Sequence, residues 1–208
     1  MNERFYQLPE EKQNTIINAG YRVFSRNSYK KSPMSEIADA AKISKSLLFH
    51  YFQNKREFYL FLWDKCCKTT VEYMERYDCY GQTELFEMLE RGLKAKLGLM
   101  KLYPDLGAFA LQAFYEKDPQ VCPAVQESCR EYYDYKAAAA IGNLDSGQFV
   151  PGLDIPMMYK QMYWATEGYL LERMRMGEVD TVQMEKDFEE MFRFWKKIFM
   201  RDAGKEQV

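Results

Sequence analysis

The side chains best suited to chemistry in this sequence lie in one short stretch and are hydrogen-bond donors rather than catalytic groups. This stretch carries hydroxyls and ammonium groups at helical spacing, together with the single imidazole of the chain. Such groups, placed near the positive end of a helix, can hold the phosphates and base edges of DNA. The candidate DNA-contacting residues are Ser32, Ser44, Lys45, Ser46, Leu47, His50, Tyr51 and Lys55.

Two short helices joined by a tight turn must position these residues. The pair Ser32–Pro33 favours a helix start, because a hydroxyl can cap the first turn and proline has no amide hydrogen to leave unpaired. Ser44 favours a second start, so helices are predicted over 33–41 and 44–50. These are the dimensions of a helix-turn-helix, whose second helix lies in the major groove of DNA. The predicted packing residues are Ile37, Ala38, Ile43, Leu48 and Phe52.

The formal net charge of −2 conceals an asymmetry along the chain. Residues 1–60 carry ten Lys and Arg against six Asp and Glu, whereas the remainder carries 19 against 25. A basic N-terminal part on an acidic body favours a polyanion as the partner of that end. Solvated surface charge would give the same count, so this alternative stays open.

The rest of the chain is also predicted to be helical, with Pro and Gly marking the breaks. Strict alternation of apolar and polar residues is absent, and so is any Asn-Gly or Asp-Gly hairpin signal. The fold class is therefore predicted to be all-α, with about nine helices. Besides the two short helices, these are expected at about 9–27, 54–78, 82–102, 105–116, 119–142, 154–177 and 180–203.

The sequence argues against several other classes of protein. No apolar run approaches the roughly 18 to 20 residues of a membrane span, and MNERFYQLPEEK has no signal-peptide character. Five Cys without a CxxC pair argue against a secreted disulfide scaffold and for a cytoplasmic setting. A zinc site and a cofactor are not expected. P-loop, GxGxxG, GxSxG and HExxH motifs are all absent, so no enzyme is expected, and catalysis by carboxylates alone is the alternative left open.

The stretch IADAAKISKSLLFHYFQNKREF, residues 37–58, resembles the DNA-binding signature of TetR-type bacterial transcriptional regulators. The resemblance implies a helix-turn-helix DNA-binding domain over 1–53, with the motif at about 33–52. It also implies a helical regulatory domain for ligand binding and dimerisation over 54–208. The implied function is that of a homodimeric repressor of a double-stranded DNA operator. The residues in register with the family pattern are Ile37, Ala38, Ala41, Ser44, Leu48, Tyr51, Phe52 and Lys55.

The sequence departs from the family pattern at Ser28, Lys42, Ser46 and Phe49. Ser28 and Lys42 stand where glycine is usual, and a side chain in the turn at Lys42 predicts strain or a different turn geometry. Ser46 replaces a glycine that lets the backbone approach DNA. Phe49 replaces a tyrosine and removes one phosphate-binding hydroxyl. The operator of a relative therefore cannot be transferred to this protein.

The predicted helix 154–177 is apolar on two faces, and the helix 180–203 carries apolar residues at a spacing close to 4-3-4-3. A helix that is apolar on two faces must be covered on both. The core of the same chain can cover one apolar face, and a second subunit is the simplest way to cover the other. The resemblance implies the same pairing, as a four-helix bundle across a two-fold axis. Ordinary core is the alternative. The predicted dimer interface residues are Met158, Met162, Ala165, Tyr169, Phe188, Met191, Trp195 and Ile198.

Helices between about 60 and 176 would then enclose a small-molecule effector that releases the repressor. Aromatic and methionine side chains make adaptable pocket walls, and the chain has 16% aromatic residues and 13 Met. The same residues are typical of plain core, and a regulator without an inducer, or one that binds another protein, is the alternative function. The predicted lining residues are Trp63, Tyr103, Phe109, Phe114, Tyr132, Tyr133, Tyr163, Trp164 and Glu167.

Overall fold

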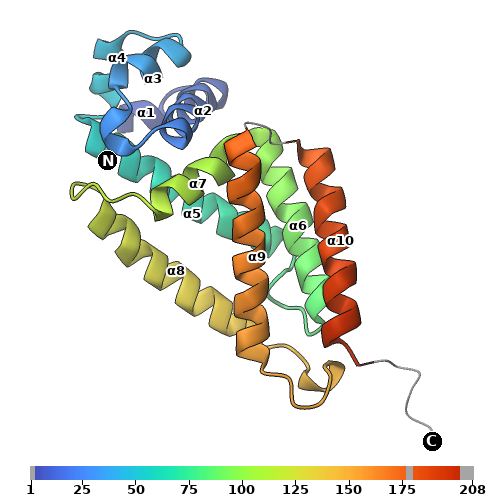
Figure 1. Cartoon of the computed structure of the whole chain (residues 1–208). Helices are drawn as coiled ribbons and strands as arrows, with labels where there is room; N and C mark the ends of the chain where they lie inside the picture. Colours follow the sequence, from blue (N-terminus) through green and yellow to red (C-terminus); the bar gives the residue numbers. More distant parts are fainter. Residues whose placement is uncertain (1–2, 177–179, 202–208) are drawn as a thin grey trace, which may run out of the picture. The chain divides into compact units, whose positions relative to one another are not determined.

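The computed structural model describes residues 3–176 and 180–201 and is helical almost throughout (Figure 1). The prediction of an all-α chain is confirmed, since the described residues form no strand beyond one isolated bridge, Phe149 to Met200. The α-helices are α1 (Glu3–Tyr6), α2 (Glu10–Arg26), α3 (Met34–Ala40), α4 (Lys45–Tyr51), α5 (Lys55–Arg76), α6 (Leu85–Leu102), α7 (Leu106–Phe114), α8 (Cys122–Gly142), α9 (Ile155–Met176) and α10 (Thr181–Phe199). Two 3₁₀ turns are η1 (Tyr29–Lys31) and η2 (Ser146–Gln148).

The helix missing from the sequence prediction is α1, a single turn of four residues. Four residues are too few for a periodic signal, so only tertiary contacts reveal it. In the described part of the chain, no helix is long and apolar enough to cross a membrane.

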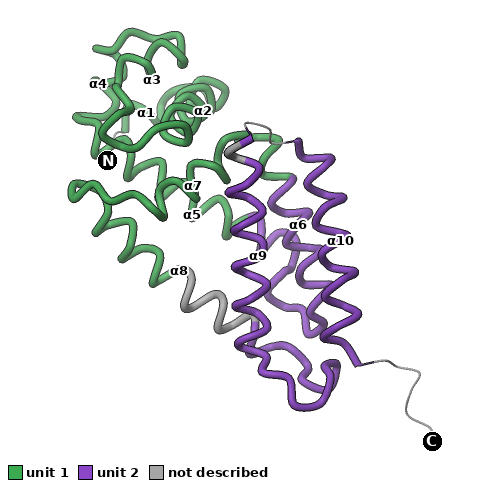
Figure 2. Tube along the Cα trace, in the orientation of Figure 1, with its two compact units in different colours: residues 1–72, 98–134 green, residues 73–97, 135–208 purple. Residues whose placement is uncertain are grey.

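The chain divides into two compact units, shown in two colours in Figure 2. Unit 1 comprises residues 1–72 and 98–134, and unit 2 comprises residues 73–97 and 135–208. This division follows packing, whereas the predicted boundary at residue 53 concerns function and stays a prediction.

Aromatic rings fill the core of unit 1. The ring centroid of Phe109 in α7 lies 5.0 Å from that of Tyr21 in α2 and 5.3 Å from that of Tyr59 in α5. Gly20 lets α2 approach α5, because a Cβ at this position would lie 2.5 Å from Cδ1 of Leu62. Helix α2, against which α3 packs, is thus held from the side by α5 and α7.

Unit 2 is built mainly from most of α6 together with α9 and α10 (Figure 2). The ring of Phe192 in α10 packs against two other rings. Its centroid lies 6.4 Å from that of Phe86 in α6 and 6.0 Å from that of Phe188 in α10. The amide of Leu85 donates to Oε1 of Gln148 at 2.9 Å and fixes the start of α6. Unit 2 therefore has an apolar core of its own.

Candidate nucleic-acid interface

The helix-turn-helix is formed by α3, α4 and the turn between them. Lys42 has φ = 56°, a left-handed conformation that favours glycine, so the strain predicted for this turn is present. The amide of Ile43 donates to the carbonyl of Ala38 at 3.0 Å and closes the turn. Ile37 and Leu48 are buried beneath it, as the predicted packing requires.

Helix α4 begins at the predicted cap and presents the predicted donors to solvent. Oγ of Ser44 accepts a hydrogen bond from the amide of Leu47 at 3.1 Å, which confirms the cap. Lys45, Ser46 and Leu47 are exposed in the first turn, and His50 is exposed in the last. An exposed helix face with cations and hydroxyls at its positive end suits contacts with DNA phosphates and bases.

Ser32 is the one predicted contact that lies fully inside the protein. Its exposed fraction is 0%, and its Oγ donates to the carbonyl of Ser28 at 3.0 Å. Helix α3 begins at Met34 with Pro33 before it and has no side-chain cap. The predictions of a cap and of a DNA contact are therefore wrong for Ser32, because its hydroxyl is used to close the turn before α3.

Lys55 and Tyr51 stabilise the interior of unit 1 in this structure. Nζ of Lys55 donates to the carbonyl of Tyr29 at 2.8 Å and lies 4.4 Å from the centre of the Tyr29 ring. Burial lowers the pKa of the Lys55 amine. The ring of Tyr51 is buried and packs edge-on against Phe5, with centroids 6.1 Å apart. These contacts give both residues packing and anchoring roles, and the phosphate contacts predicted for them stay predictions.

A buried carboxylate, Glu116, anchors the segment after α7 to the turn before α3. Oε2 of Glu116 accepts a hydrogen bond from the amide of Tyr29 at 2.6 Å. Oε1 accepts from the amides of Lys117 and Asp118 at 2.8 and 2.9 Å. No sequence signal could have found this anchor, because 87 residues separate its two partners.

Comparison with known proteins supports the same assignment. Residues 16–60, which include α3 and α4, match the family described as "Bacterial regulatory proteins, tetR family". The chain belongs to the TetR family of bacterial regulators. It is a DNA-binding transcriptional regulator and not an enzyme, as the sequence predicted.

Several relatives extend the comparison beyond the DNA-binding part of this TetR-family chain. The fatty acid metabolism regulator protein of Bacillus subtilis (strain 168) is 23% identical over 151 residues, 73% of this chain and 77% of that protein. A TetR-family regulator from Chloroflexus aurantiacus J-10-FL superposes with a TM-score of 0.65 and 20% identity, covering 96% of this chain and 98% of the other. FadR from Bacillus subtilis, solved in complex with stearoyl-CoA, gives a TM-score of 0.57 and 18% identity, with 86% and 96% covered. The structural neighbours share the fold.

The predicted dimer residues of this TetR-family chain do not share one surface. Met158, Met162, Phe188 and Trp195 are buried within their own chain, and Met158 is only 2% exposed. Their assignment to the interface is wrong, because they fill the core of unit 2. Among the other predicted interface residues, Ala165 and Ile198 are exposed, and Tyr169 and Met191 are half-buried.

Large apolar side chains that the sequence did not assign to the interface are also exposed on α9 and α10. Trp164 is 51% exposed and Phe194 is 60% exposed, and Met157 is also exposed. On α9, Met157 and Trp164 precede the buried Met158 and the predicted Ala165 by one residue each. One residue is a rotation of about 100° around a helix, so the choice of Met158 in place of Met157 selects a buried side chain, whereas Ala165 beside Trp164 is exposed.

The predicted ligand-lining residues are divided between the two units. Trp63, Tyr103 and Phe109 are buried in unit 1, and the Tyr103 hydroxyl donates to Oδ1 of Asn14 at 2.8 Å. Tyr103 and Phe109 both pack on Tyr21 of α2, and the pocket role predicted for them stays a prediction. Of the remaining predicted residues, Phe114 and Trp164 are exposed, and Tyr163 and Glu167 are half-buried. The side chains of Tyr132 and Tyr133 lie outside the described residues.

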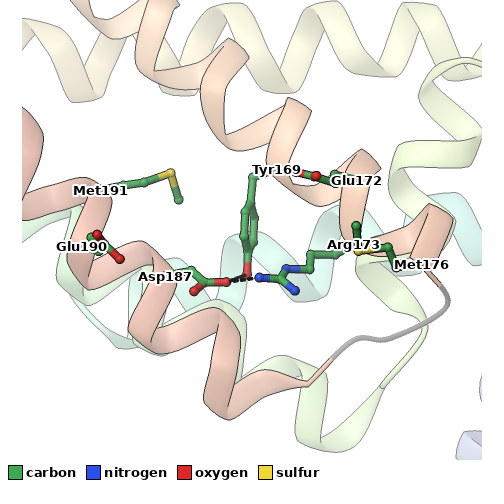
Figure 3. Close-up of a pocket in the computed structure, with 7 residues that line it drawn as sticks. All are labelled: Tyr169, Glu172, Arg173, Met176, Asp187, Glu190 and Met191. Carbon is green, nitrogen blue, oxygen red and sulfur yellow. Dashed lines mark hydrogen bonds and ion pairs between the residues drawn. The ribbon is translucent and has the colours of Figure 1, made fainter.

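A hollow of about 340 Å³ lies between α9 and α10 and is drawn in Figure 3. Within it, the Asp187 carboxylate accepts hydrogen bonds from the Tyr169 hydroxyl, at 2.7 Å, and from the Arg173 guanidinium. These hydrogen bonds, that of Tyr169 foremost, lower the pKa of the Asp187 carboxyl. None of the predicted ligand residues whose side chains the structure describes lines this hollow, and its charged walls suit a brace between two helices rather than an apolar ligand.

Proposed function

We propose that this TetR-family regulator is a dimeric repressor that leaves its operator when a small, largely apolar ligand binds. The observation that carries the DNA-binding part is the exposed first turn of α4, where Lys45 and Ser46 follow the Ser44 cap. A two-fold dimer would present two such helices to half-sites roughly 34 to 36 Å apart.

The proposal of a dimer rests on exposed apolar side chains of α9 and α10. In a monomer, Trp164 and Phe194 would each expose a large apolar surface to solvent. Ala165 and Gly168 are also exposed on α9, and small residues let a second helix approach closely. A second copy of the chain would cover this surface by a two-fold contact.

The proposal of an effector rests on buried polar atoms in α5. The hydroxyls of Tyr59 and Thr69 and Nε1 of Trp63 are buried, and none has a hydrogen-bond partner among the described residues. An unsatisfied buried donor costs roughly 1–3 kcal/mol, so a bound acceptor would be stabilising there. All three residues lie on the buried side of one helix.

We infer that an acyl-CoA thioester is the first effector to test. A FadR relative was solved with stearoyl-CoA, and another relative is a fatty acid metabolism regulator. A long acyl chain suits apolar walls, and the thioester carbonyl accepts hydrogen bonds of the kind that Trp63 and Tyr59 can donate.

The proposed mechanism is a shift between two conformations. A ligand that prefers the form with wrongly spaced recognition helices removes the dimer from DNA. A coupling of about 1–3 kcal/mol lowers operator affinity roughly 5- to 150-fold. Helix α5 (Lys55–Arg76) is the proposed lever, because it starts beside α4 and carries the three buried donors.

The test is fluorescence anisotropy on DNA from the protein's own upstream region, across a salt series, with and without stearoyl-CoA. We expect sequence-specific binding that falls steeply with salt, is lost in Lys45→Ala, and weakens on addition of stearoyl-CoA but not of free CoA. Binding that no acyl-CoA changes would favour the alternative of a regulator without an inducer. Binding equal on all sequences would contradict the recognition role of α4.

A further inference from the structure

The N-terminal helix α1 is attached to the end of the recognition helix. Phe5 is 0% exposed, and its ring centroid lies 5.1 Å from that of Phe52, just after α4, and 5.2 Å from that of Phe61 in α5. Gln13 of α2 donates to the carbonyl of Leu8 at 2.8 Å and fixes the link between α1 and α2. The backbone at residue 4 is therefore held beside α4 before any DNA arrives.

Arg4 extends from this anchored turn to the exposed end of α4. Its Nη1 lies 3.0 Å from Nε2 and 3.4 Å from Nδ1 of His50, and both side chains are exposed. A guanidinium only donates, so the imidazole accepts through a ring nitrogen. His50 thus positions Arg4 at the edge of the surface that carries Lys45 and Ser46.

The chemistry of Arg4 in this position calls for an anion. A guanidinium has five N–H donors, and His50 uses a single nitrogen of it. Among the described residues, no carboxylate forms an ion pair with Arg4. A phosphate diester matches the planar fork of arginine in two parallel hydrogen bonds.

We propose that Arg4, outside the helix-turn-helix, binds a backbone phosphate of the operator and that His50 positions it. This inference rests on the proposed role of α4 as the recognition helix. Because α1 is anchored by Phe5, little conformational freedom is lost when the phosphate binds. The contact adds affinity without sequence preference, since phosphates carry no base information.

The test compares Arg4→Ala with Arg130→Ala, a matched loss of one exposed arginine on α8. Each phosphate contact contributes roughly 0.9 to the slope of log affinity against log salt, so two copies per dimer contribute roughly 1.8. We expect Arg4→Ala to lose this slope and to bind operator and unrelated DNA about tenfold more weakly, whereas Arg130→Ala behaves as the wild type. Equal slopes for wild type and Arg4→Ala would overturn the proposal.

Two further variants separate positioning from folding. His50→Gln keeps a hydrogen-bond acceptor and should retain most of the slope, whereas His50→Ala should lose part of it. Thermal unfolding of Arg4→Ala should match that of the wild type, because the side chain is exposed; a large loss of stability would instead assign Arg4 a structural role. If Lys45→Ala abolishes specific binding while Arg4→Ala changes nothing, this inference fails and the proposed function stands. If neither variant changes binding, the assignment of α4 fails as well.

Discussion

Helix α4 and the outer face of α10 both expose large apolar side chains, but in different arrangements. On α4, Phe49 is exposed beside a cation, with Nζ of Lys45 5.9 Å from its ring centroid. On α10, Phe194 and Ile198 are exposed at a spacing of four residues and so share one face. On α4, the exposed Leu47 and Phe49 are two residues apart and do not share a face. Exposed apolar residues that share one face form a patch that suits a protein partner, whereas scattered ones do not. The difference teaches that the arrangement of exposed apolar side chains, rather than exposure itself, indicates the partner.

The largest expected effect comes from Phe194→Glu on the surface proposed for dimerisation. A central aromatic residue in an interface contributes about 2 kcal/mol, and each dimer has two copies, so dimerisation should weaken by roughly a thousandfold. Sedimentation velocity measures this, and operator affinity should fall with it. Val182→Glu is the matched control, since Val182 is equally exposed on α10 but faces another direction. A dimer unaffected by Phe194→Glu would break the comparison.

A smaller effect is expected from Lys55→Met at the base of the DNA-binding part. The ammonium group of Lys55 holds the Tyr29 carbonyl, so its loss should destabilise the fold by about 1–3 kcal/mol. The salt slope of DNA binding should not change. Lys45→Met is the control, because it should reduce the salt slope of DNA binding and leave the stability of the fold unchanged. Urea unfolding and anisotropy measure the two quantities, and a reduced slope in Lys55→Met would restore the phosphate contact predicted from the sequence.

The smallest effect is expected from Lys42→Gly in the turn between α3 and α4. A left-handed residue with a Cβ costs about 1–2 kcal/mol, and the extra freedom of glycine in the unfolded chain offsets part of this. A net gain of roughly 0.5–1 kcal/mol should appear in thermal or urea unfolding. Lys42→Ala removes the charge and keeps the strain, so it should not be stabilising. Equal stability of the two variants would show that charge rather than conformation decides this position.

Local patterns were sufficient to predict the recognition element. The Ser44 cap, the two short helices and the buried Ile37 and Leu48 all depend on hydrogen bonds and periodicity within a few residues. The strained turn at Lys42 was also predictable, because a family glycine was missing from it. Such features need no knowledge of the rest of the chain.

The periodicity of apolar residues did not identify which face of α9 is buried. Apolar residues surround much of this helix, so no single stripe identified the side that packs in unit 2. The choice of Met158 and Met162 as interface residues was wrong for that reason, whereas Trp164 was predicted to line a pocket and is exposed. Only contacts with other helices decide between such faces.

The sequence by itself determined the helical class, the helix-turn-helix and the family, because these follow from short-range patterns between residues 16 and 60 and from the breaks along the chain. Only the tertiary structure placed Arg4 beside His50 and Glu116 beside the Tyr29 amide, across 46 and 87 residues. Hydrogen bonds of that separation leave no local trace in a sequence. They form only after the helices have packed, when the two partners are brought together.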